Sequence, residues 1–165
     1  MRITATEETG LRLVVQLAGR YPATAAVGDL AAAEGLAEPF AAKVVAVLKR
    51  AGLVRASRGR SGGYTLAVPP GQITVLQVLG ALGERLFDVG FCDRHGYVEA
   101  TCRRHRDCAL RPVWACLDSA VAELFGSITL ADLVAGEARM RDRLAGRSGV
   151  KQPPPERAVE REVSQ

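Results

Sequence analysis

All four cysteines of this 165-residue chain lie in one segment, FCDRHGYVEATCRRHRDCALRPVWAC, which runs from Phe91 to Cys116. Cysteines that serve only as small apolar core residues would be scattered along the chain, so the clustering indicates metal or redox chemistry. A chain of this length, 48% hydrophobic, can build a core without disulfides. Five arginines lie among the cysteines and would stabilise thiolates, the form that binds metals and attacks disulfides.

The residues alone leave three uses of these thiols open. Thiolates are soft donors that suit the irons of an iron–sulfur cluster. Three cysteines and a histidine, His95 or His105, would suit a structural zinc ion, and cysteines without metal could form a thiol–disulfide switch. An electron-transfer or disulfide-exchange enzyme is disfavoured, because the sequence has no C-x-x-C motif, no four-cysteine ferredoxin spacing and no clear nucleophile–base pair.

The chain before the cysteines begins with a predicted helix over residues 5–20. Thr4 and Glu7 fit a capping box at its start. Glu8 also lies in the first turn, where a negative charge suits the helix dipole. The apolar stripe of this helix comprises Leu11, Val14, Val15 and Ala18.

Two further helices, over 27–34 and about 38–51, are predicted on either side of a turn at Gly35. This arrangement is typical of a helix-turn-helix, whose second helix enters the major groove through its N-terminal residues. The predicted buried face of the second helix comprises Phe40, Val44, Val47, Leu48 and Ala51. Its candidate DNA-binding residues are Glu38, Pro39, Phe40, Lys43 and Arg50.

The next stretch, LVRASRGRSGGYTLAVPP, predicts a strand, a tight turn and a second strand. We expect Gly62 and Gly63 to supply the positive φ values of the turn. A basic hairpin directly after a recognition helix is typical of a wing, whose arginines reach phosphates or a narrow minor groove. The candidate DNA-binding residues of the wing are Arg58, Arg60, Ser61 and Tyr64.

The remainder of the chain predicts a helix over 73–82, an irregular stretch from Gly83 to Asp107, a long helix from Leu110, and one last helix over 130–144. The long helix carries apolar residues at alternating three- and four-residue steps, which favours packing against a partner subunit. The members of this ridge are Val113, Trp114, Leu117, Val121 and Leu124. We expect Cys116, beside the ridge, to be a buried core thiol.

The fold class predicted is mainly α with a small β wing, a winged helix-turn-helix domain followed by a dimerisation helix. We divide the chain into a DNA-binding domain over 1–82, a cysteine-containing loop over 83–109, a dimerisation part over 110–145 and a disordered tail over 146–165. The net charge of +4 permits a nucleic-acid partner. The N-terminus lacks a signal-peptide pattern and no segment predicts a membrane span, so we expect a cytoplasmic protein.

These features together resemble the bacterial winged-helix iron–sulfur transcriptional regulators, the family that includes IscR and NsrR. The resemblance covers roughly residues 1–138. It rests on the opening MRIT, the block LKRAGLVRASRGRSGGYTLAVPP, the helix ITVLQVL, the cysteine segment, and SITLADLV near the end. The wing pattern RG-x-x-GGY-x-L, followed by three spaced cysteines, is the specific part.

The resemblance implies a homodimeric repressor that binds a double-stranded operator and holds an iron–sulfur cluster, of [2Fe-2S] type, near the dimer interface. It assigns Cys92, Cys102 and Cys108 as three ligands. The histidine ligand of the best-known member is replaced here by Arg111, which cannot bind iron. Other members use a carboxylate near position eight of the partner subunit, which here is Glu8, with His95 and His105 as competing candidates.

Overall fold

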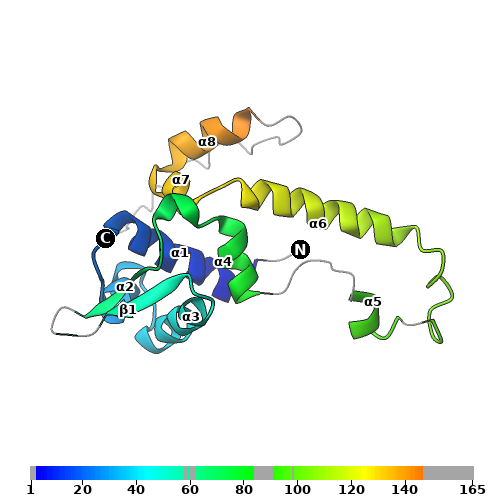
Figure 1. The fold of residues 1–165 in the computed structure, drawn as a ribbon, viewed down its shortest axis with the longest axis horizontal. Coiled ribbons are helices and arrows are strands. Elements are labelled where there is room, and N and C mark those ends of the chain that lie inside the picture. The colour runs from blue at the N-terminus through cyan, green and yellow to red at the C-terminus, as the bar shows by residue number, and fades with distance from the viewer. Residues whose placement is uncertain (1–2, 58, 60–61, 84–90, 98, 147–165) are drawn as a thin grey trace, which may run out of the picture.

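The structure is a computed structural model that describes residues 3–57, 59, 62–83, 91–97 and 99–146. The first three helices are α1 (Ala5–Arg20), α2 (Val27–Ala33) and α3 (Glu38–Arg50). A hairpin of β1 (Val54–Ser57) and β2 (Gly63–Leu66) follows, then the 3₁₀ turn η1 (Pro70–Gln72) and α4 (Val75–Leu82). The chain continues through α5 (Phe91–Arg94), α6 (Leu110–Gly126), α7 (Leu130–Val134) and α8 (Glu137–Ala145) (Figure 1).

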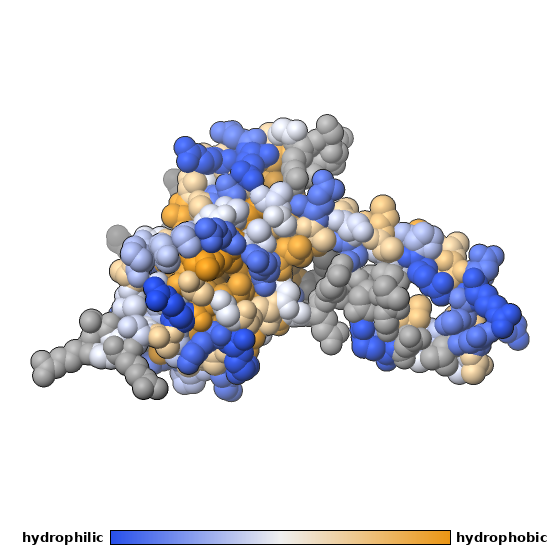
Figure 2. All heavy atoms as spheres, viewed as in Figure 1, coloured by the Kyte–Doolittle hydropathy of each residue, from blue (hydrophilic) through white to orange (hydrophobic). Residues whose placement is uncertain are grey.

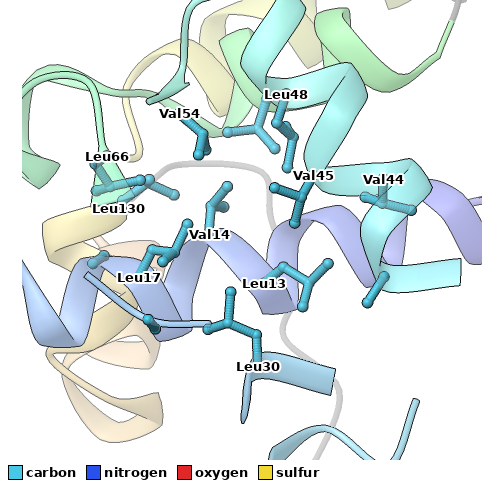
Figure 3. Packing of buried hydrophobic residues seen from close by; sticks show 14 of the residues in the cluster. Leu13, Val14, Leu17, Leu30, Val44, Val45, Leu48, Val54, Leu66 and Leu130 are labelled. Carbon is cyan, nitrogen blue, oxygen red and sulfur yellow. The ribbon is translucent and has the colours of Figure 1, made fainter. Parts of the chain in front are cut away.

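Helix α1 is the centre of the hydrophobic core. It packs against α3, α4 and α7, and its Leu13, Val14 and Leu17 are fully buried. Figure 3 shows Leu13 and Val14 on the side toward Val45 and Leu48 of α3, and Leu17 nearer Leu66 and Leu130. The predicted stripe was therefore wrong in part, because Leu11 and Val15 are only half-buried. A helix covered on several sides needs a wider apolar face than a helix lying on a surface.

The helix-turn-helix is formed by α2 and α3, as predicted. The turn between them contains Gly35 with a φ of 64°, and α3 ends before Gly52 with a φ of 75°. Both values lie in the left-handed region that favours glycine. The buried face of α3 comprises Ala41, Val44, Val45 and Leu48. The predicted members Phe40 and Val47 are half-buried, and Ala51 lies exposed beyond the end of the helix.

The wing is an antiparallel hairpin with Val54 opposite Leu66. The predicted role of its glycines was wrong, because Gly59 has the positive φ, at 122°, and Gly62 and Gly63 do not. These two glycines are required by close backbone approach instead. A Cβ atom on Gly63 would lie 2.5 Å from the carbonyl oxygen of Ala25. The hairpin is thus joined edge-on to the segment before α2, through reciprocal backbone hydrogen bonds between Ala25 and Tyr64 of 2.8 and 2.9 Å.

The chain returns to the core after α6. The N–H of Val75 donates to the carbonyl of Ile128, and the N–H of Leu130 donates to the carbonyl of Ile73, both at 2.9 Å. Leu130 is fully buried among the core residues of α1 and the wing. The single last helix that we predicted is two helices, α7 and α8, because the chain turns at Gly136 with a φ of 93°.

Helix α6 leads away from this core as an arm that carries the cysteine segment at its far end (Figure 1). Leu110, Val113, Trp114 and Leu117 of α6 are 41–57% exposed. Figure 2 shows apolar and hydrophilic residues side by side along the arm. No helix among the described residues is long and apolar enough to cross a membrane.

Candidate DNA interface and cysteine site

Lys43 and Arg50 lie on the outer face of α3. Ala41 and Val45, each two residues from Lys43, are fully buried, and residues two apart in a helix point to nearly opposite sides. Lys43 and Arg50 are both exposed, and neither has an ion pair with another described residue. These two cations are therefore free to meet phosphate or base acceptors.

The first turn of α3 is arranged differently. Glu38 is exposed, but its carboxylate folds back toward α2, so that a methyl group on Gly28 would lie 3.3 Å from its Oε2. Pro39 is exposed and its side chain offers no donor or acceptor. Phe40 is half-buried against the core. The structure thus separates Glu38 and Phe40 from the outward face on which Lys43 lies.

Tyr64 is the one candidate DNA-binding residue of the wing that lies among the described residues. Tyr64 is half-buried, packs against the core and is held by its backbone to Ala25. Arg55 of β1 donates from Nε to the carbonyl of Leu66 at 3.4 Å. Arg58, Arg60 and Ser61 lie outside the part of the chain that the structure describes.

The cysteine segment begins with the short helix α5, in a stretch that we predicted to be irregular. Cys92, Cys102 and Cys108 are all half-buried. Their carbonyls accept hydrogen bonds from the backbone N–H groups of residues three to five positions on, at 2.8–3.1 Å. The three cysteines are thus built into turns. Among the described residues, no three Cys, His, Asp or Glu side chains lie close enough together to hold a metal ion.

The two histidines of the segment have different surroundings. The ring of His95 stacks on Phe91 with centroids 4.2 Å apart, and its Nδ1 lies 2.8 Å from the carbonyl oxygen of Phe91. Because a carbonyl only accepts, Nδ1 carries the proton and Nε2 is left to bind another group. His105 is half-buried, and its carbonyl accepts from the guanidinium of Arg111 at 2.8 Å.

Glu8 lies in the first turn of α1, with its side chain 53% exposed. Its Oε1 accepts from the Nε of Arg12 at 2.9 Å, and Arg12 also lies 3.8 Å from Glu34, the residue directly after α2. Glu34 in turn accepts from Gln16 at 2.7 Å. The hydrogen bond and charge of Glu8 raise the pKa of Arg12. Sequence reasoning missed this network, although the four-residue spacing of Glu8 and Arg12 is a signal for such a pair.

Cys116 is exposed, which corrects the prediction of a buried core thiol. The prediction rested on the position of Cys116 in an apolar helix, next to the ridge residues Trp114 and Leu117. Cys116 instead lies on the projecting part of α6, between the exposed residues Trp114 and Leu117.

Comparisons with known proteins now place the chain. The family model Rrf2, described as iron-dependent transcriptional regulator, matches residues 3–136. A relative from Mycobacterium tuberculosis, which bears the name of an HTH-type transcriptional regulator, is 34% identical over 140 residues, covering 82% of this chain and 83% of its own length.

Two solved structures are similar over most of this chain. CymR, the global cysteine regulator of B. subtilis, is 27% identical with a TM-score of 0.66, covering 82% of this chain and 97% of its own. IscR of T. potens is 26% identical with a TM-score of 0.64, covering 93% and 94%. The winged-helix fold predicted from the sequence is thereby confirmed. The chain belongs to the Rrf2 family of DNA-binding transcriptional regulators, whose members are not enzymes.

Proposed function

We propose that this regulator binds an iron–sulfur cluster of the [2Fe-2S] type through Cys92, Cys102 and Cys108, and that the cluster controls its affinity for an operator, which it represses. The signal is a change of redox state, nitric oxide, or the supply of iron and cluster. The observation that carries the proposal is the confinement of three half-buried thiols to one short segment at the start of the exposed arm. A buried structural role would not require the thiols to be gathered there.

The donor set fits such a cluster by its chemistry. Three thiolates are soft ligands for iron, and the exposed Arg103 and Arg104 directly follow Cys102 in the chain. Because the described side chains do not converge in a single subunit, the segment must close and a further donor must come from elsewhere. When bound, the cluster supplies a redox-active centre with one weakly held iron.

Glu8 of the partner subunit is the fourth ligand in this proposal. Its carboxylate is exposed and lies on the first turn of α1, so it is accessible to a second chain. If Glu8 left Arg12, the guanidinium would keep Glu34 as its partner, and no buried charge would be stranded. His95 is the competing ligand, because its Nε2 is free while Nδ1 is held by a carbonyl, the pattern common for ligating histidines.

DNA binding is assigned to residues 1–82, with 83–109 as the cluster loop and 110–145 as the dimerising part. α3 enters the major groove, and the wing places Arg58, Arg60 and Ser61 on the backbone or in the minor groove. The geometry of the proposed dimer would couple the cluster to DNA binding. Residues of α1 that hold the cluster across the dimer set the separation of the two α3 helices, and DNA half-sites demand a fixed separation.

The test is the anaerobic purification of the full chain with measurement of iron, sulfide and visible absorbance. We expect a brown protein with about two irons per chain, as a [2Fe-2S] cluster requires. Cys102→Ser should lose the colour, and the matched control Cys116→Ser should keep it. A colourless wild-type protein, with zinc or with free thiols, would overturn the cluster assignment.

A second candidate, a cluster-free thiol switch, is favoured by one observation. Cys116 is an exposed thiol on α6, and CymR, a cysteine regulator, shares the fold. In this case the mild oxidant diamide would join two cysteines of the colourless protein, the thiols losing two electrons and two protons to diamide. A disulfide-dependent change in DNA affinity, absent in Cys116→Ser, would support this candidate over the cluster.

A further inference from the structure

Lys43 is the one cationic side chain in the first two turns of α3, and its neighbours there cannot read bases by hydrogen bonding. Pro39, Ala42 and Ala46 have no side-chain donor or acceptor. The carboxylate of Glu38 is turned back toward Gly28, as described above. Hydrogen-bonded readout by this part of the helix therefore depends on Lys43.

The position of Lys43 along the helix distinguishes it from Arg50. With a rise of about 1.5 Å per residue, Lys43 lies about 8 Å from Glu38 along the axis, and Arg50 lies about 18 Å from it. The major groove is about 12 Å wide. A helix that enters it with its N-terminal end carries Lys43 to the base edges and leaves Arg50 at the level of the backbone phosphates.

The small side chains beside Lys43 support the same conclusion. Ala42 is exposed and Ala46 half-buried, so neither holds the helix axis away from the groove floor. Lys43 has no acidic partner among the described residues that would compete for its ammonium group. A lysine on a flexible stem, free and close to base edges, finds its acceptors at O6 and N7 of guanine, which lie side by side in the major groove.

We propose that Lys43 is the specificity-determining residue of α3 and that it selects a guanine in each operator half-site. The inference rests on the proposed role of α3 as the recognition helix, and it is independent of the cluster. It gives Arg50 a different role, as a contact to phosphate without base preference.

The test starts from the full chain, purified without oxygen, and duplexes selected by it from a random pool. We expect one guanine to be required in each half-site, and its replacement to weaken binding about 5- to 150-fold, the range for a base contact of this kind. Replacing that guanine by 7-deazaguanine, which lacks the N7 acceptor, should weaken binding by the wild type about 3- to 10-fold. Binding by Lys43→Met should be insensitive to the same replacement.

Two further variants make the outcome decisive. Lys43→Gln should shift the preferred base from guanine to adenine, since a glutamine amide matches N6 and N7 of adenine. Arg50→Met should weaken binding to all sequences alike and reduce the salt slope by about 0.9. Equal weakening of every sequence by Lys43→Met, with a smaller salt slope, would show a phosphate contact and overturn the inference alone. Unchanged binding by both methionine variants would overturn the role of α3 itself.

Discussion

In the proposed mechanism the carboxylate of Glu8 can bind either Arg12 of its own subunit or the cluster of the partner subunit. The strength of the contact with Arg12 therefore matters for the ligand role. Within one subunit the Glu8 carboxylate is held by Arg12 at 2.9 Å on the exposed surface of α1. An exposed pair of this kind is screened by solvent and contributes little to stability. A bond between Glu8 and iron would be much stronger than the contact between Glu8 and Arg12, so Arg12 would not prevent Glu8 from acting as a ligand.

Removal of the Glu8 carboxylate should therefore act on the cluster and scarcely on folding. We expect Glu8→Gln to fold normally, to show an altered visible spectrum, and to lose iron faster in air than the wild type. The measurement is absorbance over time after exposure to oxygen, with operator affinity determined in parallel.

His95→Gln is the matched comparison for this prediction. Its spectrum and iron retention should equal those of the wild type if Glu8 is the ligand. An unaltered Glu8→Gln protein beside an altered His95→Gln protein would assign the fourth ligand to His95.

Gly63 shows how one residue can determine where the wing lies. A methyl group there would meet the carbonyl oxygen of Ala25 at 2.5 Å, closer than real contacts allow. We expect Gly63→Ala to lower the free energy of unfolding by about 1–3 kcal/mol, as overpacking does, and to weaken DNA binding by moving the hairpin. Urea denaturation checks the first effect. Gly71→Ala is the control, since no atom lies within 4 Å of the added methyl; equal stability losses in both variants would contradict the explanation.

Three helices of the core begin in the same way. Thr4, Thr74 and Thr129 each form a capping box with the residue three positions on, at the starts of α1, α4 and α7. In the third box the partner is Asp132, which accepts from the backbone N–H of Thr129 at 2.8 Å and from its hydroxyl at 2.7 Å. Arg143 of α8 also contacts Asp132, so this box joins α7 to α8.

The charge of Asp132 should make α7 sensitive to acid. The hydrogen bond from the Thr129 backbone, followed by that from its hydroxyl and the charge of Arg143, lowers the pKa of Asp132. A carboxylate whose pKa is lower in the folded state stabilises it at pH values above the unfolded value and ceases to do so as the pH falls through the folded value. We expect Asp132→Asn to cost about 1 kcal/mol of unfolding free energy at pH 7.

The difference between Asp132→Asn and the wild type should shrink once the pH drops below the ordinary aspartate value of 3.8. Urea denaturation at several pH values measures it. Asp142→Asn, a change at an exposed aspartate of α8, is the control and should match the wild type throughout. A difference at Asp132 that stays constant down to low pH would contradict the electrostatic cause.

The parts of this fold that could be predicted from sequence have strong local signals. The cap at Thr4, the glycines at Gly35 and Gly52 and the apolar periodicity define α1 to α3 and the wing. The return of α7 could not be predicted, because it depends on backbone pairing of residues 73–75 with 128–130, far apart in the chain. Helix α5 has four residues, too few to show a period.

In the candidate site, too, only the features with local sequence signals could be predicted. The clustering of all four cysteines could be read from the sequence, because residue type is a local property. The assignment of Cys92, Cys102 and Cys108 as ligands came from the family resemblance and stays a prediction. The contact of Arg12 with Glu34 could not be predicted, because it requires the end of α2 to lie beside α1. The predicted burial of Cys116 was also wrong, because the sequence does not show how far α6 projects from the core.

At the level of the whole molecule, α6 carries four of the exposed large apolar side chains of the described chain. Leu110, Val113, Trp114 and Leu117 are all more than two-fifths exposed on one ridge. Contiguous apolar side chains of this size on a projecting helix are costly in water and mark interaction sites. A second copy of the chain is the partner we propose, since helix-turn-helix proteins that bind DNA as dimers read two half-sites.

Breaking this ridge should separate the subunits and weaken DNA binding together. We expect Val113→Glu to run as a monomer in light scattering at concentrations where the wild type is a dimer, because two buried carboxylates would face one another across a symmetric interface. Operator affinity should fall at least about 100-fold, since each subunit then binds its half-site without the effective concentration supplied by its partner. The matched control is Ser119→Glu, an added charge at an exposed position six residues away and on the other side of α6. The control should remain dimeric and bind the operator fully, which would show that an added charge on this helix is harmless by itself. A dimeric Val113→Glu protein, or a monomer with full operator affinity, would contradict the placement of the dimer interface on α6.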